Sequence, residues 1–105
     1  MSNVTTLLDS MQQRFNPGAA SGMDEIFQYD IDDEGSWHII IRQDQCEITP
    51  ADETEASVTL SMSKDTLAAV ISGETDGMQA FMMGDIKASG DVMLATRLSD
   101  LFPLA

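Results

Sequence analysis

The chain has 105 residues, of which 43% are hydrophobic and 22% are charged, and its formal net charge is −13 at pH 7. This length predicts one globular domain over residues 1–105, because a chain of about 100 residues forms a single core. Its 18 acidic residues face only 5 basic ones, and a field of that sign repels phosphate groups. Nucleic acid is therefore not expected as a partner, and attraction to an anionic membrane is disfavoured.

No segment has the pattern of a targeting signal or a membrane span. The first 15 residues lack a basic region followed by a continuous apolar run, as a signal peptide requires. No apolar run approaches the roughly 18 residues that span a bilayer, and the last three residues are no peroxisomal signal. Cys46 is the single cysteine, so no disulfide framework is expected. We expect a cytoplasmic protein without stable membrane insertion.

The first predicted elements are an amphipathic helix and three strands. Apolar residues at helical spacing from Val4 to Phe15 predict a helix that ends at Asn16-Pro17-Gly18. Alternating apolar residues then predict strands at 26–31 and 37–42, joined by the acidic turn 32–35, and a third strand after a turn at Gln43-Asp44. In these strands Phe27, Tyr29, Ile31, Trp37, Ile39, Ile41, Cys46 and Ile48 are expected to face inward.

The second half returns to helices after one more strand. A long acidic loop at 49–56 can carry the chain to another place in the sheet before a strand at 56–62. Ser63 and Gly73 predict the ends of a helix at 64–72, and Thr75 is expected to cap a helix at 76–83. A fifth strand is predicted at 85–89, with Ile86 and Ala88 inward, and a final helix runs from Gly90-Asp91 to Phe102.

These elements predict an α+β (α/β) fold with a five-stranded, mainly antiparallel sheet that helices cover on one face. The expected order is one helix, four strands, two helices, one strand and one helix. An antiparallel sheet covered on one side shows one polar and one apolar face, as these strands do.

The candidate catalytic and metal-binding residues are better explained by structure. His38 alternates with the apolar face and is expected to point to solvent or to the opposite surface of the sheet, away from Cys46, so that a Cys-His nucleophilic pair is not expected. Asp30, Asp32, Glu34 and Gly35 imitate the start of a calcium loop, but Ile41 stands where a bidentate glutamate is required. No metal site and no cofactor are expected. A catalytic interpretation would need a deep cleft that brings His38 to a carboxylate.

The segment 78–102 has more apolar residues than the apolar face of an amphipathic helix requires. It holds four of the 8 methionines, whose unbranched side chains can repack around different shapes. Helical spacing alone leaves two interpretations open, an ordinary core and the wall of a ligand cavity.

The motif FMMGDIKASGDVMLA at 81–95, continued by Leu98 and Leu101-Phe102, resembles the sterol carrier protein 2 (SCP2) family, as do the strand at 58–62 and the order of elements. The resemblance covers nearly the whole chain, and in the N-terminal half it rests on Trp37 and the strand order. It implies a hydrophobic tunnel that binds fatty acyl chains, fatty acyl-CoA, phospholipids or sterols without transforming them. Because the chain is acidic and has no peroxisomal signal, it fits a stand-alone lipid-binding domain of bacterial type, and sterol transfer by membrane collision is not expected.

On this resemblance we expect a lipid cavity between the last quarter of the chain and the sheet. Its predicted lining is Phe27, Ile39, Val58, Leu60, Leu67, Val70, Ile71, Met78, Phe81, Met82, Ile86, Met93, Leu94, Leu98 and Phe102. For an anionic head group the sequence offers Lys87 and Arg97, and Arg97 is expected to pair with Asp100. The alternative is an accessory module that presents a lipid-like substrate to a partner enzyme, and a homodimer is also open.

Overall fold

Five strands form one mixed sheet in the computed structural model, which describes residues 4–103. The strands are β1 (Glu25–Ile31), β2 (Gly35–Arg42), β3 (Gln45–Pro50), β4 (Val58–Met62) and β5 (Lys87–Gly90). Their order is β3-β2-β1-β4-β5, with β1 and β4 parallel and the other neighbours antiparallel. The sheet predicted from the sequence is thus confirmed, with one parallel pair inside a mainly antiparallel arrangement.

Tight turns join the first three strands. Gln43 and Asp44 both have positive φ, 53° and 59°, as a two-residue hairpin turn requires when its twist matches that of the strands. Asp33 and Gly35 also have positive φ in the turn between β1 and β2. After β3, residues 51–57 carry the chain past β2 and β1, so that β4 pairs with the far side of β1.

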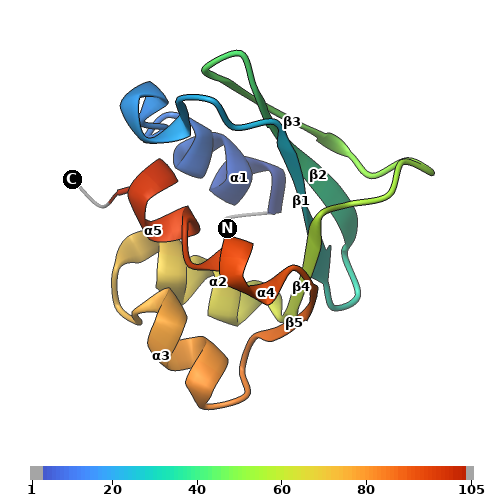
Figure 1. Ribbon diagram of the computed structural model, residues 1–105. Helices are drawn as coiled ribbons and strands as arrows, with labels where there is room; N and C mark the ends of the chain where they lie inside the picture. Colours follow the sequence, from blue (N-terminus) through green and yellow to red (C-terminus); the bar gives the residue numbers. More distant parts are fainter. Residues whose placement is uncertain (1–3, 104–105) are drawn as a thin grey trace.

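The helices lie together on one side of the sheet (Figure 1). They are α1 (Val4–Gln12), the 3₁₀ helix η1 (Pro17–Ala20), α2 (Lys64–Ser72), α3 (Gly77–Met82), α4 (Val92–Ala95) and α5 (Leu98–Leu101). The other face of the sheet carries the segment between β3 and β4 and is otherwise left open by these helices. No helix within residues 4–103 is long and apolar enough to cross a membrane.

Local signals set the ends of α2 as predicted. The Ser63 side chain accepts a hydrogen bond from the Thr66 backbone N–H, and Gly73 closes the helix with φ 86°. Other boundaries differ from the prediction, and the fifth strand is Lys87–Gly90 in place of 85–89, so that Ile86 precedes it. The first helix ends at Gln12, before Phe15; Asp76 and not Thr75 caps α3; and the final helix is two short helices, because the chain leaves helical hydrogen bonding at Thr96 and Arg97.

The core lies between the sheet and α1, α2 and α5. Phe27, Ile39 and Val58 are fully buried, and the register places Phe27 between the other two, in one row across β2, β1 and β4. Leu8 of α1 and Leu101 of α5 are almost completely buried over this side of the sheet. This row of the sheet is therefore ordinary core.

Candidate functional site

A cavity of about 380 Å³ lies between the helices and the next rows of the sheet. Its floor consists of Tyr29 of β1 and of Leu60 and Met62 of β4, and the register pairs Tyr29 with Leu60. Walls come from every α-helix, and the mouth is marked by Met78, Phe81 and Val92, which are 41%, 37% and 38% exposed. The full lining is Met11, Arg14, Tyr29, Leu60, Met62, Leu67, Val70, Ile71, Thr75, Asp76, Gly77, Met78, Phe81, Ile86, Val92, Ala95, Thr96, Leu98, Ser99, Phe102 and Pro103.

Most residues that the sequence placed around a cavity line this one. They share the inward faces of β4 and α2 or belong to the last quarter of the chain. They are Leu60, Leu67, Val70, Ile71, Met78, Phe81, Ile86, Leu98 and Phe102.

The other predicted lining residues lie elsewhere, for two reasons. Phe27, Ile39 and Val58 form the core row one step further along the strands, where they are fully buried. Met82 and Met93 are 80% and 77% exposed, because their helical positions turn them outward. Leu94 is half-buried and packs against the core. These six residues are outside the lining of the cavity.

Sequence reasoning missed the contribution of α1 to the cavity. Met11 of α1 and Arg14, in the turn that follows α1, both line it. Apolar periodicity in the first helix could have found Met11, but it predicts that Arg14 is exposed to solvent. Arg14 is half-buried, and it is the one basic residue among the lining residues that the structure describes.

The Arg14 guanidinium is positioned by the end of α2. Its Nη1 donates a hydrogen bond to the Ile71 carbonyl oxygen, one of the carbonyl groups that the last helical turn leaves without an intrahelical partner. The basic residues proposed from the sequence lie outside the cavity lining: Lys87 is exposed on β5, and Arg97 donates to the Ala19 carbonyl oxygen at 3.3 Å. Among the described residues Arg97 has no ion pair with Asp100, so that expectation was wrong.

A polar group also lies in the floor of the cavity. The Tyr29 hydroxyl donates a hydrogen bond to the Met11 sulfur at 3.7 Å, and Tyr29 is 5% exposed. Burial, together with the neighbouring Cys46, holds the pKa of Tyr29 well above its ordinary value of 10.0. The hydroxyl is therefore neutral and a hydrogen-bond donor at physiological pH.

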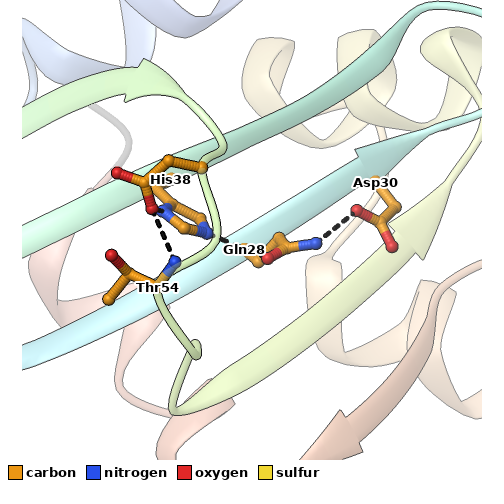
Figure 2. Close-up of polar contacts among 5 residues, drawn as sticks. Gln28, Asp30, His38 and Thr54 are labelled. Carbon is orange, nitrogen blue, oxygen red and sulfur yellow. Dashed lines mark hydrogen bonds and ion pairs between the residues drawn. The ribbon is translucent and has the colours of Figure 1, made fainter.

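On the open face of the sheet, a polar network lies across β1 and β2 (Figure 2). His38 Nε2 lies 2.9 Å from Gln28 Oε1, and Gln28 Nε2 donates to Asp30 Oδ1 at 2.9 Å. His38 Nδ1 lies 3.6 Å from Asp52 Oδ1, in the segment between β3 and β4. Of the two expected positions, His38 takes the opposite surface of the sheet, where it is only 1% exposed and does not point to solvent.

This network lies outside the lining of the cavity and of a second hollow, both formed by the described residues. The Thr54 backbone N–H, with a smaller contribution from His38, keeps the pKa of Asp52 below its ordinary value. Neither His38 nor Asp52 lines the cavity described above. The histidine and the carboxylate therefore lie apart from the cavity that the described residues form.

The remaining candidate residues have structural roles. Asp30 accepts from the Ser36 hydroxyl at 2.6 Å and so braces the hairpin between β1 and β2. Cys46 is a free, half-buried thiol that packs against the core, and burial raises its pKa to about 12. Within residues 4–103 no cluster of histidine, cysteine and carboxylate side chains could hold a metal ion.

A second hollow lies at the open edge near β4 and β5 and is lined mainly by polar residues. It includes Asp32, Ser61, Asp85 and Lys87 and has a volume of about 440 Å³. Such a surface is poorly matched to an acyl chain, because each buried polar group needs a hydrogen-bonding partner. The smaller apolar cavity is the better candidate site.

Comparison with known proteins identifies the family. The chain is 26% identical over 68 residues to sterol carrier protein 2 of Bos taurus, an alignment that covers 65% of this chain and 12% of that protein. Palmitated SCP2L2 of Aedes aegypti has a TM-score of 0.73 and 22% identity, covering 98% of this chain and 96% of that one.

The stereoselective inverting sec-alkylsulfatase Pisa1 of Pseudomonas sp. contains the same fold, with a TM-score of 0.85 and 19% identity, over 99% of this chain and 17% of the sulfatase. The chain thus spans less than a fifth of the length of the sulfatase and of the bovine protein. The model of the SCP-2 sterol transfer family matches residues 5–103. The resemblance seen in the sequence is confirmed, and the chain belongs to the SCP-2 sterol transfer family.

Proposed function

We propose that this chain binds an amphipathic lipid with a fatty acyl chain in the 380 Å³ cavity and releases it unchanged. The observation that carries the proposal is an apolar cavity of ligand size, walled by soft side chains, with a single cation in its described lining. Ligand pockets are commonly about 300–1,000 Å³, with few polar groups. The name of the Aedes aegypti structure, a palmitated SCP2L2, supports an acyl ligand.

The energetics of the cavity favour occupation. An empty apolar cavity of 380 Å³ would cost at most about 9 kcal/mol, at ~24 cal/mol per Å³. That is comparable with the ~5–15 kcal/mol by which small domains are stable. Each methylene that a ligand buries returns about 0.8 kcal/mol, so a lipid in this cavity stabilises the fold.

Arg14 gives the ligand its orientation in this proposal. A guanidinium binds a carboxylate or phosphate through charge-assisted hydrogen bonds, and Arg14 has donors left over beyond the bond to Ile71. The acyl chain then extends over Tyr29, Leu60 and Met62 toward the exposed mouth. Transfer without reaction is supported by the location of His38, which lies on the opposite face of the sheet.

Filling the cavity tests the proposal. Ala95 lines the cavity and is half-buried. Ala95→Phe should lower the affinity for a fluorescent fatty acid at least 10-fold, because the larger side chain fills the cavity. Met82→Phe is the matched control, because Met82 is 80% exposed on α3 and outside the lining. Native mass spectrometry of the purified protein should show bound lipid. Equal affinities of both variants and the native chain would contradict the proposal.

A second candidate function is an accessory module that presents lipid-like substrates to an enzyme. It is favoured by exposed methionines beside the cavity, since Met82, Met83 and Met93 are 80%, 67% and 77% exposed, and such surfaces adapt to partners. The same fold within the much longer Pisa1 chain supports it further. Met82→Gln combined with Met93→Gln should abolish co-purification of a partner enzyme and leave fatty acid binding intact. Retention of the partner by this variant would contradict the accessory role.

A further inference from the structure

Tyr29 places a polar group where an acyl chain would otherwise meet only hydrocarbon. Among the polar side chains that line the cavity, Arg14, Thr75, Asp76, Thr96 and Ser99 are half-buried or exposed. Tyr29 is the one buried polar residue in this lining, and it lies on the central strand of the sheet. Tyr29 therefore supplies a polar residue at the floor of the cavity and not at its mouth.

The hydroxyl has a weak partner there. It donates to the thioether sulfur of Met11 at 3.7 Å, and a thioether is a poor acceptor compared with an oxygen. Both residues of this bond line the cavity. A ligand oxygen that reaches the hydroxyl can replace the sulfur, since the Met11 side chain has several rotatable bonds and can move aside.

The second polar group of the cavity limits where that oxygen belongs on the ligand. Arg14 lies in the turn that follows α1, and its backbone N–H donates a hydrogen bond to the Met11 carbonyl oxygen at 3.0 Å. The acceptor site beside Tyr29 and the anion site beside Arg14 thus lie at the same end of the cavity. A ligand whose anionic group meets Arg14 would bring its first few carbons past Tyr29.

We propose that Tyr29 makes the cavity selective for acyl ligands that carry a second hydrogen-bond acceptor, a hydroxyl, keto or ester oxygen, near their anionic end. This inference rests on the proposed function and deepens it. The geometry that carries it is the buried hydrogen bond between Tyr29 and Met11 in the cavity floor, one hydrogen-bonded turn of the chain from Arg14. An acyl chain without this second oxygen binds in the same cavity, and the Tyr29 hydroxyl then keeps its hydrogen bond to the Met11 sulfur.

The test compares octadecanoic acid with a set of keto-octadecanoic acids in displacement of a fluorescent fatty acid. For the native chain, a keto group near the carboxylate should tighten binding about 3- to 10-fold over the parent acid, as one neutral hydrogen bond does. Keto groups near the methyl end should weaken binding, because they are buried without a donor. Tyr29→Phe keeps the ring but removes the hydroxyl, and it should abolish the preference for the keto acid over octadecanoic acid.

Met11→Leu provides a control of opposite sign. It removes the sulfur acceptor and keeps an apolar side chain of similar volume, so the hydroxyl has only the ligand to bond and the preference for the keto acid should increase. Tyr29 is the only tyrosine of the chain, so the ¹³Cζ resonance of labelled tyrosine reports directly on its hydroxyl. That resonance should shift with the keto acid and not with the parent acid.

The outcomes separate this inference from the function on which it rests. The same ranking of ligands for the native chain and Tyr29→Phe would overturn the selectivity, even if all of them bind. Failure of every acid to displace the probe would contradict the proposed function, and the inference with it. A preference that disappears in Tyr29→Phe and increases in Met11→Leu would establish Tyr29 as a specificity-determining residue.

Discussion

His38 and Gln28 form a 2.9 Å hydrogen bond on the face of the sheet that the described helices leave uncovered. Because the Gln28 amide nitrogen donates to Asp30, its oxygen accepts from His38 and places a proton on Nε2. Asp30 therefore sets the tautomer of a buried imidazole through one intervening amide. These hydrogen bonds link three side chains of β1 and β2 across this face.

We expect Gln28→Leu to lower the free energy of unfolding by about 1–3 kcal/mol, because it leaves the buried His38 Nε2–H without an acceptor. The double variant Gln28→Leu/His38→Leu should recover part of that loss, since both polar partners are removed together. Asp52→Asn is the surface control, and it should change stability little. Urea denaturation of the native chain, of the single variants Gln28→Leu and His38→Leu, and of the double variant measures the coupling, and additive losses in the double variant would show that the bond has no special role.

Arg14 should control the affinity for anionic lipids. Arg14→Met removes the charge and keeps an unbranched chain, and it should weaken fatty acid binding about 10-fold or more, as expected for a charge-assisted hydrogen bond. Binding of the corresponding fatty alcohol should hardly change. Arg97→Met, at an exposed residue outside the lining, serves as the matched control. Equal losses for acid and alcohol would indicate a packing effect in place of head-group binding.

Stability should fall above about pH 9. Burial raises the pKa of Cys46 from 9.0 to about 12 and also raises that of Tyr29 above 10.0. Above these ordinary values the unfolded chain loses protons that the folded chain keeps, so rising pH favours unfolding.

The urea midpoint measured from pH 8 to pH 10.5 checks this expectation. Cys46→Ala should remove the part of the decrease that begins near pH 9, and Tyr29→Phe should remove the part that begins near pH 10. A midpoint independent of pH in the native chain would contradict the burial of both groups.

Gly90 should not tolerate a side chain. It has φ 91°, and an added Cβ would lie 2.8 Å from the Ser57 carbonyl oxygen, so Gly90→Ala should destabilise the fold by about 2 kcal/mol or more. Gly22→Ala separates strain from clash, because Gly22 has φ 76° and no atom within 4 Å of the added Cβ. It should cost about 1 kcal/mol. Thermal unfolding distinguishes the two, and equal losses would exclude a steric contribution at Gly90.

The sequence predicts most of the fold because its signals are local. Ser63 and Gly73 define α2 through their own backbone hydrogen bonds and φ, and strict alternation identifies the inward faces of β1, β2 and β4. The division of the last helix into two was not predictable from spacing, because 3.6-residue periodicity continues across Thr96 and Arg97. The burial of His38 was missed since it depends on where the segment between β3 and β4 lies.

The cavity could be predicted only in part for a related reason. Alternation identifies all inward residues alike, but the register decides which row is core and which is floor. Phe27 and Val58 are adjacent in one row, and Tyr29 and Leu60 in the next, and only the second row lines the cavity. That difference comes from how the helices are placed over the sheet, which no single strand encodes.

The parallel pairing of β1 with β4 has a kinetic consequence. The β1–β2–β3 meander is joined by tight turns, so it can form from contacts close in sequence, whereas the floor residues Tyr29 and Leu60 meet only after a long loop closes. The lipid-binding site therefore exists only in the completed fold. Bound lipid should slow unfolding in proportion to its concentration and leave the folding rate nearly unchanged.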